Sequence, residues 1–122
     1  MPKTKEEQGY ISKAILRNTR VAPRKARLVV DLVRGKRVER ALDILSCCDK
    51  KTAPLLRKLV MSAVANAKEI SKVDVDELYI KKVWVDEGRK FDRVMPRARG
   101  MATPIRKRHS TITVVLDEVG AV

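Results

Sequence analysis

Aromatic residues are scarce in this sequence of 122 residues: there are four, namely Tyr10, Tyr79, Trp84 and Phe91. The core must therefore be aliphatic, and a hydrophobic content of 44% is enough to supply one. RNA-binding modules that stack bases on a platform of aromatic side chains would lack their main tool. The length predicts a single domain, which spans residues 1–122.

Residues that support catalysis or metal binding are also few. Cys47 and Cys48 are adjacent, and His109 is the only histidine. Neighbouring cysteines rarely bridge to each other, and these three side chains cannot complete a four-ligand zinc site. There is also no glycine-rich phosphate loop and no nucleophile paired with a histidine. We therefore expect no enzyme activity, no cofactor and no metal site.

Long apolar runs are missing as well. No stretch approaches the roughly twenty apolar residues that are needed to span a bilayer. The first ten residues contain no apolar segment for secretion, and Glu6 and Glu7 argue against a transit peptide. The two cysteines are most simply reduced. These features predict a cytoplasmic protein.

Positive charge is abundant and unevenly distributed. The formal net charge is +13 and the sequence pI is about 10.2. Residues 1–30 carry a net charge of +6 and residues 89–108 carry +7, whereas the remaining residues sum to zero. A basic protein with merely solvated charges would spread them more evenly. The two clusters predict contact with a polyanion.

The second cluster has the pattern of an extended arm. It contains eight Lys or Arg residues and one acid, Asp92, and it is interrupted by Pro96, Gly100 and Pro104, so that no helix can run through it. Strand-like sequence, rich in Val, Ile and Thr, flanks it at residues 78–87 and 110–118.

The segment that connects these two stretches is too long for an ordinary loop. We expect instead that the two strands continue outward as an antiparallel pair. We expect a basic hairpin at about residues 85–110, with its turn near residues 95–103. Ten residues per arm at roughly 3.3 Å each give a reach on the order of 30 Å. Because an isolated two-stranded ribbon is barely stable in water, the hairpin should need a partner.

The rest of the chain predicts one further strand and three helices. The strand is expected at residues 10–17, and the helices at residues 23–34, 38–45 and 52–70, the last capped by Thr52 and with an apolar stripe that ends at Ile70. An acidic connector at residues 74–77 is expected to be a loop. The predicted fold class is α+β, with three helices packed on a small antiparallel sheet and a long protruding β-hairpin.

Short motifs in three places resemble one family. They are PRARG at residues 96–100 with IRKR at 105–108 and STITVVL after it, APRKAR at 22–27 with VRGK at 33–36, and ANA at 65–67. On these motifs the chain resembles the bacterial-type ribosomal protein L twenty-two family over roughly residues 10–118. Two departures stand out: Met101 replaces a usual Arg, and residues 109–111 read His-Ser-Thr rather than Thr-Ser-His.

The resemblance implies a structural constituent of the large ribosomal subunit. In such proteins the body binds large-subunit rRNA near the exit of the nascent-chain tunnel. The hairpin penetrates the RNA, and its tip helps to line the tunnel wall close to where macrolides bind. The implied partners are large-subunit rRNA, neighbouring ribosomal proteins and the nascent polypeptide, with no membrane and no small-molecule substrate. A role in assembly is also implied.

Charge and resemblance together predict the rRNA-binding side chains. Arginine suits this role because its planar guanidinium can donate two parallel hydrogen bonds to a phosphate. The body residues are Lys13, Arg17, Arg20, Arg24, Lys25 and Arg27. The hairpin residues are Arg89, Lys90, Arg93, Arg97, Arg99, Arg106, Lys107 and Arg108. The resemblance places Met95, Pro96, Arg97, Ala98, Arg99, Gly100 and Met101 at the tunnel tip.

Other interpretations remain open at this point. A β-ribbon DNA-binding protein would use the same arm, and it would be a dimer that prefers duplex DNA. A membrane-surface protein would need apolar residues opposite the charges, and the few in the arm are scattered. Trp84 is expected to pack in the core, with contact to a base or ribose as the alternative. His109 is expected to be a polar residue at a strand edge.

Overall fold

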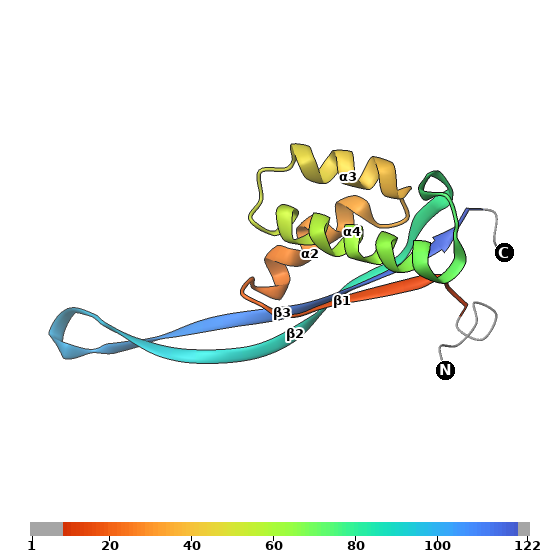
Figure 1. Cartoon of the computed structure of the whole chain (residues 1–122). Helices are drawn as coiled ribbons and strands as arrows, with labels where there is room; N and C mark the ends of the chain where they lie inside the picture. The colour runs from red at the N-terminus through yellow and green to blue at the C-terminus, as the bar shows by residue number, and fades with distance from the viewer. Residues whose placement is uncertain (1–8, 120–122) are drawn as a thin grey trace.

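The computed structural model describes residues 9–119 (Figure 1). It confirms the predicted α+β class, with three helices, an antiparallel sheet and a long hairpin. In chain order the elements are β1 (Ser12–Thr19), α2 (Pro23–Val33), α3 (Val38–Cys47), α4 (Thr52–Ser71), a 3-10 turn (Val75–Glu77), β2 (Leu78–Pro96), a tip turn (Ala98–Gly100) and β3 (Ala102–Glu118).

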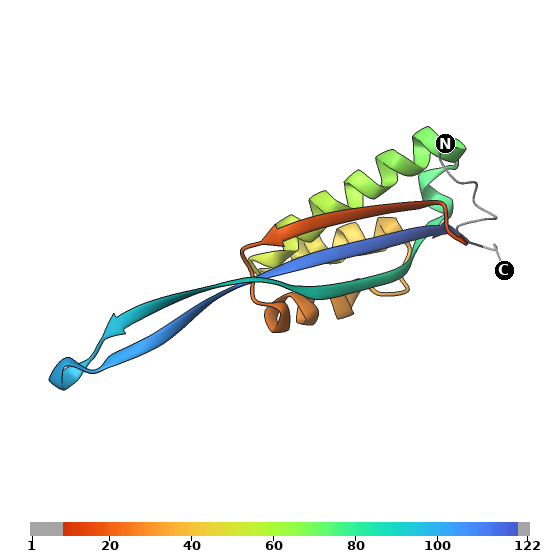
Figure 2. The ribbon, with the colours of Figure 1, turned by 90° about the horizontal axis from the view of Figure 1, so that it is seen from below.

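The sheet has the strand order β1-β3-β2, and both pairings are antiparallel. β1 pairs only with the inner half of β3, from Ser12↔Leu116 to Thr19↔Ser110. β2 pairs with β3 over its whole length, as far as Pro96↔Ala102. The sheet is therefore three-stranded where the helices cover it and continues beyond them as a two-stranded ribbon (Figures 1 and 2).

The core lies between the helices and one face of the inner sheet. As predicted, it is aliphatic, and the apolar stripes of the helices face the sheet. The Ser12 hydroxyl donates a 2.9 Å hydrogen bond to the Ala63 carbonyl, which ties β1 to α4. Fully buried side chains include Val30 and Val33 of α2, Leu56 and Val60 of α4, and Ile112, Val114 and Leu116 of β3.

Four details differ from the expectations. β1 begins and ends two residues later than predicted, and a bulge after Leu16 carries the pairing on to Thr19. Thr52 does not cap α4: it lies inside the helix, is buried and makes no capping hydrogen bond. Ile70, placed on the apolar stripe of α4, is 59% exposed. The acidic connector contains the 3-10 turn Val75–Glu77 rather than only loop.

The outer edge of β2 is covered near the start of the strand by the segment that follows α2. The Gly35 amide donates to the Ile80 carbonyl at 3.1 Å, and the Ile80 amide donates to the Lys36 carbonyl at 2.9 Å. Gly35 has a φ of +76°, a conformation that glycine adopts without strain. This turn lets the chain leave α2 and pair at once with the sheet edge.

Candidate nucleic-acid interface

The ribbon ends in a tight turn. β2 and β3 remain paired as far as Pro96↔Ala102, and the Arg97 amide then donates to the Met101 carbonyl at 2.7 Å. Arg99 and Gly100 both have positive φ values, +62° and +71°, which reverse the chain direction. The turn lies where the sequence predicted it. The structure thus brings the predicted tip residues, 95–101, together at the far end of the ribbon (Figure 1).

The cations of the ribbon are accessible. All eight are exposed, namely Arg89, Lys90, Arg93, Arg97, Arg99, Arg106, Lys107 and Arg108. Lys90 lies 3.8 Å from the Glu87 carboxylate, and the other seven have no carboxylate partner within residues 9–119. Unpaired guanidinium and ammonium groups at this density repel one another and attract a polyanion.

A neck joins the ribbon to the body, where β2 has a bulge between Glu87 and Lys90. A Cβ atom at Gly88 would lie 3.1 Å from the His109 backbone and 3.2 Å from the Asn18 side chain, so the strands approach closely here. The His109 Nδ1 atom is 3.0 Å from the Arg89 carbonyl, and its ring meets the edge of Phe91 with centroids 5.2 Å apart. His109 therefore braces the neck.

Four of the six predicted body cations fall on two separate surfaces. Arg20 and Lys25 line a hollow of about 520 Å³ between the first residues of α2 and α4. Lys50 and Lys51, which the sequence reasoning missed, line the same hollow. They lie in residues 31–88, whose net charge is only +2, so only the adjacency of the two lysines before a helix could have marked them.

The second surface is the face of the sheet that the helices leave bare. Alternation along β1 places Lys13 and Ile15 on this face, and Arg17 follows at the bulge; all three are exposed. Trp84 lies there too, opposite Thr113, and is 38% exposed. The expectation that Trp84 packs in the core is therefore wrong, because Val83 and Val85 occupy the core-facing positions.

Two arginines, Arg27 of α2 and Arg34, which directly follows the helix, have a structural partner. The Arg27 guanidinium donates to the Val85 carbonyl at 3.1 Å, and Arg34 donates to the Val83 carbonyl at 3.1 Å while pairing with Asp31. Both satisfy acceptors on the outer edge of β2. Arg27 thus has an internal contact, and its contact with RNA stays a prediction. Arg24, one turn earlier, is exposed.

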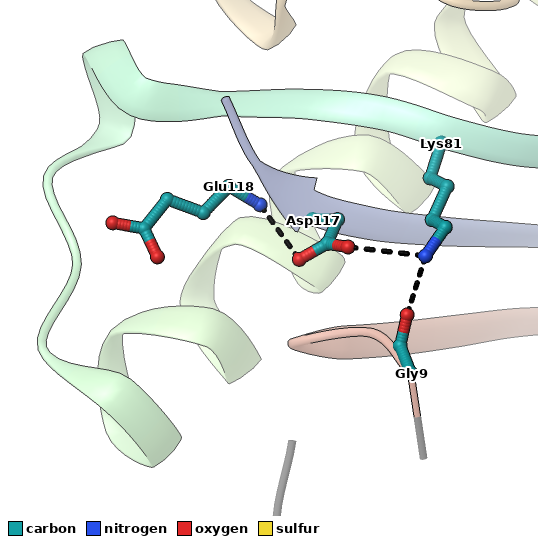
Figure 3. Close-up of polar contacts among 4 residues, drawn as sticks. All are labelled: Gly9, Lys81, Asp117 and Glu118. Carbon is teal, nitrogen blue, oxygen red and sulfur yellow. Dashed lines mark hydrogen bonds and ion pairs between the residues drawn. The ribbon is translucent and has the colours of Figure 1, made fainter. Parts of the chain in front are cut away.

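One cation of β2 acts inside the protein. Lys81 lies 3.2 Å from a carboxylate oxygen of Asp117, which is buried, and donates to the Gly9 carbonyl at 2.5 Å (Figure 3). The other oxygen of Asp117 accepts from the Glu118 amide at 2.8 Å. This cluster joins β2, the end of β3 and the segment before β1 at the end of the body opposite the ribbon.

Comparison with known proteins decides the family. The family model described as "Ribosomal protein L22p/L17e" matches residues 14–117. The chain belongs to this family. It is 54% identical over 107 residues to "Large ribosomal subunit protein uL22" of Syntrophotalea carbinolica, which covers 88% of this chain and 97% of that protein. It is 52% identical over 106 residues to the protein of the same name from Bdellovibrio bacteriovorus, covering 87% and 96%.

Family membership confirms several expectations. The resemblance drawn from the short motifs is correct, and the chain is a ribosomal protein rather than an enzyme. Its expected location in the cytoplasmic ribosome is likewise confirmed. Separately, none of the helices within residues 9–119 is long and apolar enough to cross a membrane.

Proposed function

We propose that the chain is a structural constituent of the large ribosomal subunit, in which the body binds rRNA and the ribbon inserts between RNA segments. It acts as one domain, with residues of about 85–110 as the inserted hairpin. Residues 95–101 line the nascent-chain tunnel. Neighbouring ribosomal proteins contact the rest of the surface.

The observation that carries this proposal is the exposed ribbon itself. It has no core of its own, and seven of its cations lack a carboxylate partner within residues 9–119. RNA phosphates would supply the missing counter-charges, and the surrounding nucleotides would supply the packing that a lone ribbon lacks. By neutralising phosphates of separate segments, the same side chains would lower RNA self-repulsion and so aid assembly.

The test shortens the ribbon without disturbing its base. Arg93 pairs with Ile105. Replacing residues 94–104 by Asn-Gly therefore closes the two strands with a two-residue hairpin turn. A length-matched control, Arg97→Gln with Arg99→Gln, removes the two tip charges and keeps the ribbon long.

We expect both variants to bind large-subunit rRNA fragments, with a salt dependence that is shallower by up to about 0.7–0.9 log units per lost phosphate contact. Only the shortened variant should change the tunnel wall in an electron cryomicroscopy map of subunits that carry it. An unaltered wall in those subunits would show that the tip lies elsewhere. A wild-type protein that fails to bind rRNA at low salt would overturn the proposal as a whole.

A further inference from the structure

Side chains on the helix-free face of the sheet form regular rows. Two neighbouring rows of side chains cross it from β1 through β3 to β2. The outer members of each row are exposed, whereas the central ones are buried. Antiparallel pairing defines the rows as Lys13–Val115–Lys82 and Ile15–Thr113–Trp84. A cationic row thus lies directly beside a row that ends in the only tryptophan.

The indole of Trp84 is held in place. Its N–H donates a 3.0 Å hydrogen bond to the carboxylate of Asp86, two residues further along the same side of β2. This bond satisfies the one polar group of the ring within the protein, and it limits rotation of the side chain. What remains accessible is aromatic surface, in a side chain that is 38% exposed.

The charges beside the ring favour an anion on one side only. Lys13 and Lys82 have no carboxylate partner within residues 9–119, and together with Tyr10 and Trp84 they line a hollow of about 350 Å³. Asp86 lies on the other side of Trp84 along β2 and would repel a phosphate placed there. A nucleotide seated on this face would thus have one preferred direction, with its phosphate over the lysine row.

The same side of the strand ladder continues into the ribbon. Successive side chains of β3 alternate between the two sides of the ladder without interruption. The extra residues at the register shifts all lie in β1 and β2. Thr113 faces Trp84, and Lys107, an even number of residues away, faces Phe91, so both aromatic residues lie on one side. The Arg93 guanidinium lies 5.9 Å from the centre of the Phe91 ring. Lys82, Trp84, Phe91 and Arg93 therefore lie on one side of the ladder, from the body into the arm.

We propose that Trp84 stacks against an unpaired base of the bound RNA while Lys13 and Lys82 contact the phosphate of an adjacent nucleotide. This inference rests on the proposed function, that the chain binds rRNA. Every base has a π-face, so stacking on a fixed indole needs no particular sequence. Single-stranded loops and bulges offer such bases, whereas paired helices do not.

The protein carries its own probe, because Trp84 is its only tryptophan. Intrinsic fluorescence would be recorded while large-subunit rRNA fragments are added to the full chain, and affinity would be measured over a range of salt concentrations. Trp84→Leu keeps an apolar side chain without a stacking ring, and Trp84→Phe keeps a ring without the N–H. The pair Arg97→Gln and Arg99→Gln serves as a control remote from this face.

We expect RNA to quench the fluorescence of the wild-type protein and of the Arg97→Gln/Arg99→Gln control. Trp84→Leu should weaken binding by about 5- to 150-fold with an unchanged salt slope, and Trp84→Phe should restore most of the loss. Lys13→Gln with Lys82→Gln should instead reduce the salt slope. Unfolding midpoints of all variants would show that each is folded.

Bound RNA with unchanged fluorescence, and a Trp84→Leu affinity within twofold of wild type, would overturn the stacking proposal and leave rRNA binding intact. A fluorescence change caused by an isolated ribosomal protein but not by rRNA would overturn it in favour of a protein on this face. If the wild-type chain bound no rRNA, the proposed function would fail together with it.

Discussion

The inner and outer halves of the β2–β3 ladder are both antiparallel, but they differ in burial and in the number of neighbouring strands. In the inner half Val85 and Ile112 are 5% and 0% exposed beneath the helices, whereas in the outer half Val94 is 67% exposed. The inner half also has β1 beside it, and the outer half has no third strand. The register also shifts by one residue between the two halves, at the bulge between Glu87 and Lys90. Stability should therefore be concentrated in the body, and accessible charge in the ribbon.

The largest contrast is expected from truncating one apolar side chain in each half. Leu116→Ala removes a fully buried side chain from the centre of the core and should lower the free energy of unfolding by about 2–5 kcal/mol. Val94→Ala, in the ribbon, should change it by less than about 0.5 kcal/mol. Urea unfolding followed by circular dichroism would measure both. Similar losses for the two variants would mean that the ribbon shares the cooperative core.

The second prediction concerns the ion pair between Lys81 and Asp117, at the end of the body opposite the ribbon. Lys81→Met removes a cation that lies 3.2 Å from the buried Asp117 carboxylate and should cost about 1–3 kcal/mol. Lys82→Met, its exposed neighbour without a carboxylate partner within residues 9–119, is the matched control and should be nearly neutral. Thermal unfolding of the two variants side by side gives the comparison. Equal midpoints would show that the ion pair does not contribute to stability.

The third prediction concerns the close approach of the strands at Gly88, in the neck. Gly88→Ala would push a Cβ atom to within 3.1 Å of the His109 backbone, and we expect a cost of about 1–3 kcal/mol. Gly100→Ala, at the tip, meets open space and is strained only through its positive φ of +71°. Amide NMR spectra should show shifts around Asn18 and His109 for the first variant and only at the tip for the second. Undisturbed neck signals in Gly88→Ala would show that the strands can separate there without cost.

The smallest effect concerns the covered edge of β2. Arg27→Met removes the hydrogen bond to the Val85 carbonyl and should cost about 0.5–1.5 kcal/mol. Arg24→Met, on the same helix but without such a contact, should leave stability within about 0.5 kcal/mol of wild type. Hydrogen exchange of the amides around Val85 would report the local change. If the exchange rates were the same in both variants, the Arg27 contact would have no stabilising role.

Much of this arrangement could be predicted from the sequence because its signals are local. Proline and glycine exclude a helix from residues 89–108, and β-rich segments on both sides predict paired strands. Alternating and three-to-four spacings of apolar residues likewise placed the three helices and the aliphatic core. These patterns depend only on the periods of strand and helix, so no tertiary information is needed to detect them.

The errors arise where a bulge changes the phase. Leu78 and Ile80 face the core, and simple alternation would place Trp84 with them. The extra residue between Ile80 and Lys82 reverses the alternation, so Val83 and Val85 face the core and Trp84 faces outward. The bulge after Leu16 similarly extended β1. Bulges depend on which strands pair and in what register, and a single sequence does not contain that information.

The position of the cations on separate surfaces could not be predicted either. Arg20 and Lys25 meet Lys50 and Lys51 only because α2 and α4 begin near each other in space. Charge counting along the chain found the clusters at residues 1–30 and 89–108. It could not find a group assembled from two segments, one of which lies in residues 31–88, where the net charge is only +2.

The open edges of the ribbon also affect how separate copies of the free protein interact. Beyond Glu87, both lateral edges of the two-stranded ribbon present backbone groups that could pair with another chain. Exposed strand edges of this kind are templates for aggregation, and lysine and arginine side chains are a common protection. Mutual repulsion between like-charged arms would oppose such pairing. The cations to which we assign RNA contacts would therefore also act against association of the free protein.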